Sequence, residues 1–273
     1  MQILGSDKPL VGVVHLLPLP GSPGYGGSMR PVIDRAVSDA SAYLTGGIGA
    51  LIVENYGDLP FLAGSLPPET IAALAVVARE VRALGDVMLG VNALRSDGPG
   101  ALAVAVAAQA QFVRVNVLSG AAVTDQGLIQ GCAAPLLRLR ATLRAGVAIW
   151  ADLQVKHAVP LVARDAIEEA RDLQERARAD ALIVTGHRTG APVDPKHLQH
   201  LRRELPGVPW IAGSGVSAAN LGDLWTHADG FIVGTSLKRD GRTEAPVDVE
   251  RVRALVNRHR ACGRQVPRRR RAP

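Results

Sequence analysis

The chain has 273 residues, of which 47% are hydrophobic and 21% are charged, a balance typical of a folded globular protein. This balance excludes a largely disordered chain, and no apolar run reaches the roughly 18 residues that a membrane-spanning helix requires. The formal net charge is +6, but five arginines lie in the segment 263–273, so the remainder is nearly neutral and its charge does not predict binding to nucleic acid.

The cysteines and the two terminal regions of the sequence give expectations about the cellular location of the protein. The first apolar run, 10–19, contains His15 and Pro18 and lacks the basic region of a signal peptide, so we predict a strand there. Cys132 and Cys262 lie far apart, which favours free thiols in a reducing cytoplasm over a disulfide. We expect the Arg-rich tail, 263–273, to be a solvated, disordered end, and any contact with an anionic membrane surface to involve this tail only.

Apolar runs and amphipathic patterns alternate along the chain. In chain order, eight continuous apolar runs have the length of strands that are buried on both faces: 10–15, 50–54, 87–92, 112–116, 147–152, 181–185, 210–213 and 230–233. Helical patterns lie between these runs; Ile71, Leu74, Val77 or Ala78, and Val81, for example, recur at three-to-four spacing. Asp97 and Ser217 are placed to cap two of the helices.

This alternation predicts an α/β fold, and eight strands with eight helices predict a single (β/α)8 TIM barrel over residues 1–262. No linker divides the chain into two domains. An open, doubly wound sheet is the alternative, but the first strand is not followed by the glycine-rich fingerprint of a dinucleotide-binding sheet.

Polar residues close six of the eight predicted strands. Because the active sites of such barrels lie at the C-terminal ends of the strands, we expect these side chains to meet at one mouth: His15, Glu54, Asn92, Asn116, Asp152 and Thr185. We predict that the two carboxylates exchange protons, and that Asn92, Arg114, Asn116 and Thr185 bind substrate. A salt bridge of either carboxylate to Lys156 or Arg114 is the structural alternative.

Lys156 and His15 each have more than one role that the sequence allows. Lys156 could hold an anionic oxygen, could form a Schiff base if its pKa is depressed, or could simply pair with Asp152. His15 could transfer protons, although a single histidine often serves only as a structural hydrogen-bonding group. We predict that both residues are catalytic, with Lys156 acting as a cation.

Two glycine-containing segments follow the last two predicted strands: Gly213-Ser214-Gly215 and Gly234-Thr235-Ser236. Many barrels bind phosphate with the loops after these two strands, through backbone N–H groups and a helix N-terminus. Glycine lets the backbone approach an anion because it has no side chain. The two segments therefore predict a phosphate-binding site, with ordinary tight turns as the alternative.

The segment 119–131 is long for a barrel loop. Gly127 would permit it to hinge over a bound substrate, and Asp125, near its centre, could reach the ligand. The carboxylate and asparagine oxygens at the predicted mouth are of the kind that magnesium prefers. Their spacing forms no recognised metal motif, so we predict no cofactor, with a divalent metal as the alternative.

Several segments of the sequence together resemble the BtpA/SgcQ family of ribulose-phosphate-binding-type barrels. The segments that carry the resemblance are 13–21, 54–61, 114–120, 124–127, 155–158, 213–216 and 234–238. The resemblance implies a TIM barrel with its site at the mouth, but no single reaction. One cyanobacterial branch is named for photosystem I biogenesis, and another is encoded beside sugar-uptake and sugar-epimerase genes. We expect local departures from the family at Gln154 and at His187 or Arg188, where substrate choice could differ.

We therefore expect an enzyme that uses general acid–base chemistry on a small phosphorylated sugar or a sugar-containing nucleotide, as an isomerase, a lyase or a glycosidase. The alternative is a non-catalytic assembly factor whose basic tail faces a membrane; the polar ring at the mouth argues against it. We also expect a cytoplasmic homo-oligomer without a specific nucleic-acid partner.

Overall fold

Eight parallel strands form a closed barrel in the computed structural model of the chain, which describes residues 8–186 and 190–265. Around the barrel the strands follow the order β1-β11-β10-β9-β7-β4-β3-β2. The predicted (β/α)8 barrel is confirmed, and each predicted strand end lies within one residue of the observed one. The bounds are β1 (Leu10–His15), β2 (Ala50–Glu54), β3 (Met88–Asn92), β4 (Phe112–Val115), β7 (Ala148–Leu153), β9 (Ala181–Val184), β10 (Trp210–Ala212) and β11 (Gly230–Val233).

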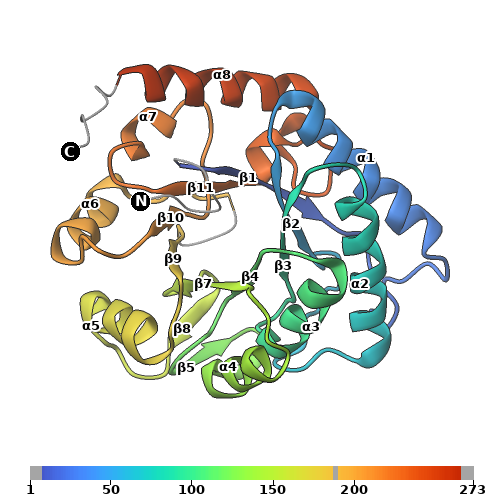
Figure 1. Cartoon of the computed structure of the whole chain (residues 1–273), viewed down its shortest axis with the longest axis horizontal. Helices are drawn as coiled ribbons and strands as arrows, with labels where there is room; N and C mark the ends of the chain where they lie inside the picture. The colour runs from blue at the N-terminus through green and yellow to red at the C-terminus, as the bar shows by residue number, and fades with distance from the viewer. Residues whose placement is uncertain (1–7, 187–189, 266–273) are drawn as a thin grey trace.

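Helices surround the barrel as an outer ring, as Figure 1 shows. They are α1 (Arg30–Gly46), α2 (Pro68–Arg82), α3 (Gly98–Ala108), α4 (Ala133–Thr142), α5 (Ala166–Arg171), α6 (Pro195–Glu204), α7 (Leu221–Leu224) and α8 (Val249–Gln265). A π-helical segment, η1 (Asp172–Arg176), continues α5, and η2 (Thr235–Leu237) and η3 (Arg239–Gly241) are short 3₁₀ helices. Asp97 caps α3 as predicted, because its side chain accepts a hydrogen bond from the Gly100 N–H. Ser217 does not cap α7, contrary to the prediction: the helix begins only at Leu221, and the Ser217 N–H donates to the Asn220 side chain.

Large apolar side chains fill the lower part of the barrel interior. Phe112 and Trp150 stack with their ring centroids 4.1 Å apart, and Ile52 and Ile183 belong to the same buried cluster. Gly90 leaves the space for this pair, since a Cβ atom there would lie 2.2 Å from the Phe112 ring. A second, larger apolar cluster fills the layer between the strands and the helices. Because both faces of the strands are packed in this way, the residues at the ends of the strands stand on rigid elements.

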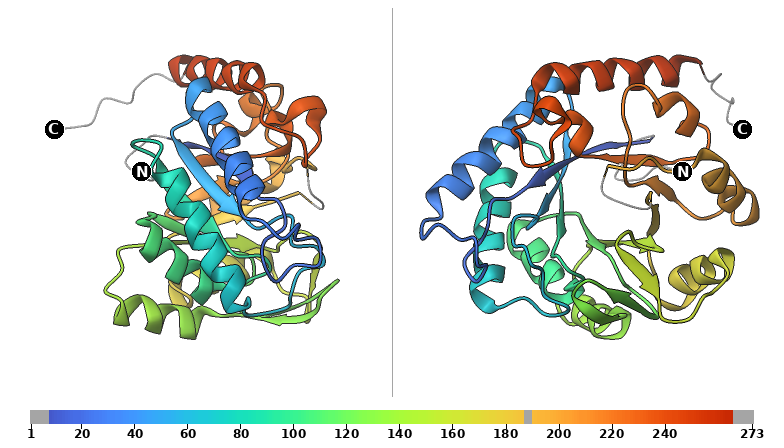
Figure 2. Two further views of the ribbon diagram at one scale, coloured as in Figure 1. Left: turned by 90° about the vertical axis from the view of Figure 1, so that its right-hand side faces the viewer. Right: turned by 180° about the vertical axis from the view of Figure 1, so that it is seen from behind.

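The segment 119–131, which we expected to be a hinging loop, is a β-hairpin. β5 (Ala121–Thr124) and β6 (Gly127–Gln130) pair in antiparallel fashion, and β8 (Ala158–Pro160), from the loop after β7, joins β5. In the side view of Figure 2, the green hairpin and the blue loop after β1 lie at the same end of the barrel. Main-chain hydrogen bonds across three strands therefore order this segment beside the mouth.

The last helix, α8, reaches into the Arg-rich segment 263–273. Because α8 continues through Gln265, the expected boundary between barrel and tail, at residue 262, lies inside a helix. The arginines at 268–271 lie outside the described residues, as do His187 and Arg188. Over residues 8–186 and 190–265, no helix has both the length and the apolar character that crossing a bilayer requires.

Candidate functional site

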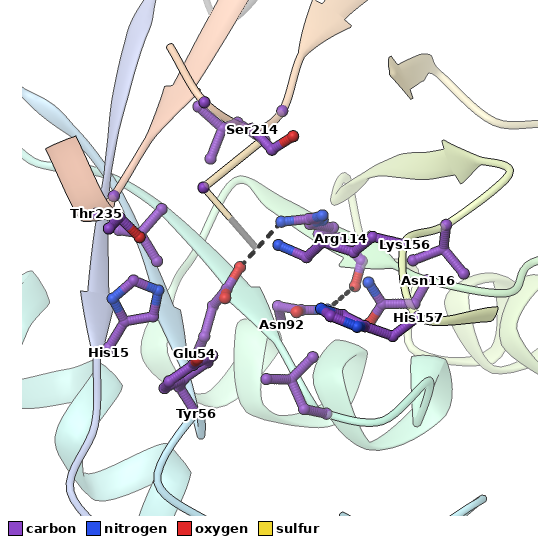
Figure 3. A pocket seen from close by; sticks show the side chains of 18 of the residues that line it. His15, Glu54, Tyr56, Asn92, Arg114, Asn116, Lys156, His157, Ser214 and Thr235 are labelled. Carbon is purple, nitrogen blue, oxygen red and sulfur yellow. Dashed lines mark hydrogen bonds and ion pairs between the residues drawn. The ribbon is translucent and has the colours of Figure 1, made fainter. Parts of the chain in front are cut away.

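A cavity of about 490 Å³ lies at the C-terminal ends of the barrel strands (Figure 3). The fold brings most of the predicted site residues into its lining: His15, Glu54, Asn92, Arg114, Asn116, Asp125, Lys156, Gly213, Ser214, Gly215, Gly234, Thr235 and Ser236. Asp152 and Thr185 are not part of this lining. Residues from both ends of the chain thus meet in one place.

Strand geometry explains why these side chains meet. Successive side chains of a strand point to opposite faces, so Glu54 shares the inward face of β2 with Ile52 of the apolar cluster. The strand register places His15 beside Glu54, Glu54 beside Asn92, and Asn92 beside Arg114. These four polar side chains therefore form the upper layer of the barrel interior, one inward position above the apolar layer.

Arg114 joins the two carboxylates of the predicted site. Its Nη1 lies 3.3 Å from Glu54 Oε1, and its Nε and Nη2 each lie 3.1 Å from an oxygen of Asp152. All three side chains are buried. Burial alone would lower the pKa of Arg114, but the charges of Asp152 and Glu54 raise this pKa above its usual value. Arg114 is thus a fixed cation that orients Glu54 in the cavity.

Asp152 is an anchor behind the cavity and not part of its surface. Besides Arg114, it holds Asn116, whose Nδ2 donates a hydrogen bond of 2.7 Å to Asp152 Oδ2. Of the two salt bridges considered as structural alternatives, the one to Arg114 forms with both carboxylates, and the one between Asp152 and Lys156 does not form. Asp152 therefore borders the cavity only through the two side chains it holds, and its role in proton exchange stays a prediction.

Lys156 lines the cavity without an ion-pair partner. Within the described chain, its ammonium group forms neither a salt bridge nor a hydrogen bond. Burial and the neighbouring charge of Arg114 lower the pKa of Lys156, and the carboxylates of Glu54 and Asp152 offset this only in part. The amine is therefore easier to deprotonate than an exposed lysine, and its charge is available to a ligand.

His15 is a neutral imidazole in the wall of the cavity. Its ring packs against Tyr56 with centroids 4.7 Å apart, and its buried Nδ1 has no hydrogen-bond partner among the residues that the structure describes. Burial, followed by the charges of Lys238, Lys156 and Arg114, lowers the pKa of His15 well below its usual value. Near neutral pH the ring is uncharged, so it can donate or accept one hydrogen bond at each nitrogen according to its tautomer.

Asn92 offers the cavity a fixed acceptor. Its Nδ2 donates to the backbone carbonyl of Arg114 at 2.9 Å and to Asn116 Oδ1 at 3.2 Å, which sets the orientation of the amide. Asn92 Oδ1 is buried and has no partner in the described part of the chain. An unsatisfied buried acceptor is costly, so a hydroxyl group of a ligand would stabilise this arrangement.

Arg95 is a cavity residue that the sequence analysis missed. Its Nη1 donates to Asp125 Oδ1 at 3.1 Å, to Gln126 Oε1 at 3.2 Å and to the carbonyl of His157 at 3.1 Å, and its Nη2 donates to the carbonyl of Lys156. These bonds tie the tip of the β5–β6 hairpin to the loop after β7. Because Arg95 closes no strand, the pattern of strand ends could not find it.

The hydroxyl groups in the two glycine-containing segments are occupied within the protein. Ser214 Oγ accepts a hydrogen bond from the Gly186 N–H and donates to the Ala191 carbonyl. Ser236 Oγ donates to the Val216 carbonyl at 2.6 Å. A ligand would therefore meet the backbone of these segments more readily than these two hydroxyls.

The backbone of the same segments has free donors. No partner for the N–H groups of Gly215, Val216, Thr235 and Ser236 occurs among the described residues. Gly234 packs against the site, since a Cβ atom there would lie 2.9 Å from the His15 ring. Several unpaired N–H groups in two adjacent loops form the kind of concavity that binds an anion.

Thr185 lies outside this cavity. It lines a neighbouring hollow, bordered by the segments 153–160 and 192–195, and its Oγ1 is buried without a partner in the described chain. The prediction that Thr185 binds the same ligand as Glu54 is therefore not supported by its position.

The donor set of the cavity does not suit a metal ion. Over residues 8–186 and 190–265, no group of three or more His, Cys, Asp or Glu side chains is arranged to hold one. The two buried carboxylates are instead bridged by Arg114, whose guanidinium stands where a shared cation would bind.

The sequence matches the BtpA family over residues 6–261. The chain belongs to the BtpA family. An uncharacterized protein of Pyrococcus abyssi is 48% identical over 254 residues, which cover 93% of this chain and 96% of that relative. The photosystem I biogenesis protein BtpA of Synechocystis is 41% identical over 255 residues, covering 93% and 89% of the two chains. The likeness of this BtpA-family chain to both relatives therefore extends over the whole barrel, and the predicted family resemblance is confirmed.

Solved structures share the barrel. A native KDPGal structure aligns with a TM-score of 0.59 and 16% identity, over 97% of this chain and 100% of the other. N-(5'-phosphoribosyl)anthranilate isomerase from Pyrococcus furiosus aligns with a TM-score of 0.56 and 13% identity, over 93% and 99% of the two chains. At such low identity the likeness shows the fold alone, which is a TIM barrel.

Proposed function

We propose that this protein is an enzyme that applies general acid–base chemistry to a small phosphorylated sugar or a sugar-containing nucleotide. One observation carries the proposal: a single cavity is lined by unpaired backbone N–H groups after β10 and β11 and by Glu54, His15 and Lys156 from other strands. An isomerase, a lyase or a glycosidase would each use such an arrangement. The substrate is the only partner that the cavity chemistry calls for.

The phosphate would bind to the backbone after β10 and β11. The N–H groups of Gly215, Val216, Thr235 and Ser236 lack partners in the described chain, and all four residues line the cavity. Converging backbone N–H groups stabilise a phosphate without a side-chain charge.

Glu54 would act as the general base. Arg114 holds one of its oxygens, while Oε2 forms no hydrogen bond within the described residues and can accept a proton from the substrate. Neutral His15 would exchange a hydrogen bond with the same ligand, and Asn92 Oδ1 would orient a hydroxyl group. Lys156 would stabilise negative charge on the ligand, because its ammonium has no internal partner.

A thermal-shift screen with phosphosugars and nucleotides identifies the ligand class. A ligand at roughly 100 times its dissociation constant stabilises the folded state by about 2.7 kcal/mol, which such a screen detects. With the substrate in hand, Glu54→Gln should lower kcat by about 10²- to 10⁴-fold, because glutamine keeps the hydrogen bond to Arg114 but cannot take a proton. Glu69→Gln, an exposed change outside the cavity, is the matched control and should leave kcat unchanged.

Thr235→Asp tests the phosphate site separately. The carboxylate can keep the hydrogen bond with Thr243 that the native hydroxyl makes, so the fold should persist. It also places a negative charge among the four N–H groups and should weaken binding of a phosphorylated ligand at least about tenfold by like-charge repulsion. Thr235→Ser should bind normally. If calorimetry gave Thr235→Asp and the native protein equal affinity for the phosphorylated ligand, the phosphate would not bind at this position.

The non-catalytic alternative has one observation in its favour, the name of the Synechocystis relative, photosystem I biogenesis protein BtpA. An assembly factor has no need of a proton-accepting Glu54, so Glu54→Gln would then leave its biological activity intact. The cytoplasmic location and the homo-oligomer stay predictions; light scattering of the purified protein tests the second.

A further inference from the structure

Lys156 differs from the two arginines of the cavity. Arg114 is bound to two buried carboxylates, and Arg95 is bound to Asp125 at 3.1 Å. The ammonium group of Lys156 has no carboxylate and no hydrogen-bond acceptor of its own within residues 8–186 and 190–265. The ammonium group of Lys156 is therefore available to form an ion pair with a ligand in the cavity.

The surroundings of Lys156 favour an anion with a full charge. Burial and the charge of Arg114 both disfavour the ammonium form and lower the pKa of Lys156. An anionic ligand group beside it would reverse this effect, because it favours the charged amine and screens it from Arg114. A charge-assisted hydrogen bond to such a group is about twice as strong as one between neutral partners.

The loop that carries Lys156 is held in place before any ligand arrives. Arg95 donates hydrogen bonds to the backbone carbonyls of Lys156 and His157. Two residues further on, β8 begins and pairs with β5 of the hairpin. Because these contacts restrict the backbone, less conformational entropy is lost when the ammonium binds a ligand.

The position of Lys156 also separates it from the proposed phosphate site. Lys156 follows β7, whereas the unpaired N–H groups follow β10 and β11, and β9 stands between β7 and β10 in the barrel. Both nevertheless line the same cavity. A ligand whose phosphate lies on the N–H groups therefore reaches Lys156 with its opposite end.

We propose, building on the function proposed above, that the substrate is a phosphorylated sugar acid whose carboxylate binds Lys156. The phosphate lies on the backbone N–H groups after β10 and β11, and the carboxylate lies at the far end of the carbon chain. Asn92 Oδ1, which reaches the same cavity from β3 on the side opposite β10, accepts a hydrogen bond from an intervening hydroxyl. Lys156 is a specificity-determining residue in this arrangement.

Matched pairs of ligands test the second anion. Phosphoglycerate, phosphoerythronate and phosphogluconate are compared with glycerol phosphate, erythritol phosphate and sorbitol phosphate; within each pair, a terminal carboxylate replaces a hydroxymethyl group. Calorimetry on the full-length protein should show that, for at least one chain length, the acid binds about tenfold or more tightly than the alcohol. Three lengths are used because the carboxylate must reach Lys156.

Two substitutions assign the preference to Lys156. Lys156→Gln should abolish the advantage of the acid while leaving the affinity for the alcohol within about twofold of the native value. Lys196→Gln removes the same charge from the exposed surface of α6, outside the cavity, and should keep the full preference. An unchanged melting temperature of Lys156→Gln shows that its fold is intact. If that melting temperature falls, Lys156→Arg replaces it as the test variant; because arginine keeps the charge, this variant should retain part of the preference for the acid.

The possible results separate the two proposals. Acids and alcohols that bind equally, at all three lengths, would overturn the carboxylate site while leaving the phosphate site standing. Failure of every phosphorylated ligand to bind would overturn the proposed function and this inference with it. A borohydride-stable adduct at Lys156, mapped by mass spectrometry, would also overturn the inference, because the amine would then attack a carbonyl carbon instead of binding an anion.

Discussion

The two layers of the barrel interior come from the same strands but have opposite chemistry. In the lower layer, Ile52 and Phe112 belong to a buried apolar cluster with Trp150. Two positions further along the same strands, Glu54 and Arg114 form the upper layer and bind each other at 3.3 Å. Both layers are buried, so the difference lies in what the side chains require of their neighbours.

The apolar layer stabilises the fold simply by leaving water, whereas every group of the polar layer must find a partner. Arg114 and Asp152 satisfy each other, but His15 Nδ1, Asn92 Oδ1 and the Lys156 ammonium do not find partners in the described chain. Unsatisfied polar groups that gather in one cavity are a feature of functional sites, where local stability is given up for binding. The unsatisfied groups of the upper layer therefore support the ligand site proposed there.

Removal of Arg114 should have the largest effect on stability. Arg114→Met leaves Glu54 and Asp152 buried without a countercharge, which should lower the free energy of unfolding by about 3–5 kcal/mol in urea titrations near neutral pH. Arg140→Met, which removes the more exposed pair with Asp180, is the control and should cost about 1 kcal/mol or less. Similar losses from the two variants would contradict the view that the upper layer depends on its charge balance.

A methyl group in the lower layer should have the next largest effect. In Gly90→Ala the new Cβ would lie 2.2 Å from the Phe112 ring, which is stacked on Trp150 and has little room to move. Overpacking of this kind should lower the free energy of unfolding by about 1–3 kcal/mol. Gly26→Ala, where no atom lies within 4 Å of the new Cβ, should change stability little. If both variants melted at the native temperature, the lower layer would be less tightly packed than the structure indicates.

The smallest expected effect is a dependence of the free energy of unfolding on pH, which arises from His15 in the upper layer. Unfolded His15 titrates near its usual pKa of about 6.5, whereas the folded state lowers the pKa of His15 well below that value. Below pH ~6.5 the unfolded chain therefore binds a proton that the folded chain does not, and the free energy of unfolding falls as the pH falls. At pH ~5.5, the free energy of unfolding should therefore have fallen by about 1 kcal/mol less in His15→Gln than in the native protein.

Urea titrations of the native protein and of His15→Gln, at neutral and mildly acidic pH, measure this difference. The comparison of the two proteins cancels the other titrating groups. Parallel losses in both would mean that His15 is protonated in the folded state and is not the neutral imidazole described above.

The amino-acid sequence by itself determined the strands, their order and the inward residues at their ends. Continuous apolar runs mark strands buried on both faces, and alternation within a strand is a local property, so His15, Glu54 and Asn92 could be predicted as mouth residues. The two glycine-containing segments could be found in the same way, because loop position in a barrel follows from strand order.

Only the tertiary structure decided which of these residues become partners. Asp152 binds Arg114 and not Lys156, Arg95 reaches the mouth without closing a strand, and the segment 119–131 pairs with β8 to form a small sheet. Each of these results depends on contacts between segments far apart in the chain, where competition among several charged or hydrogen-bonding groups is settled by distance and burial. A sequence pattern states which groups are available, but the free energy of each pairing depends on geometry that only the folded chain provides.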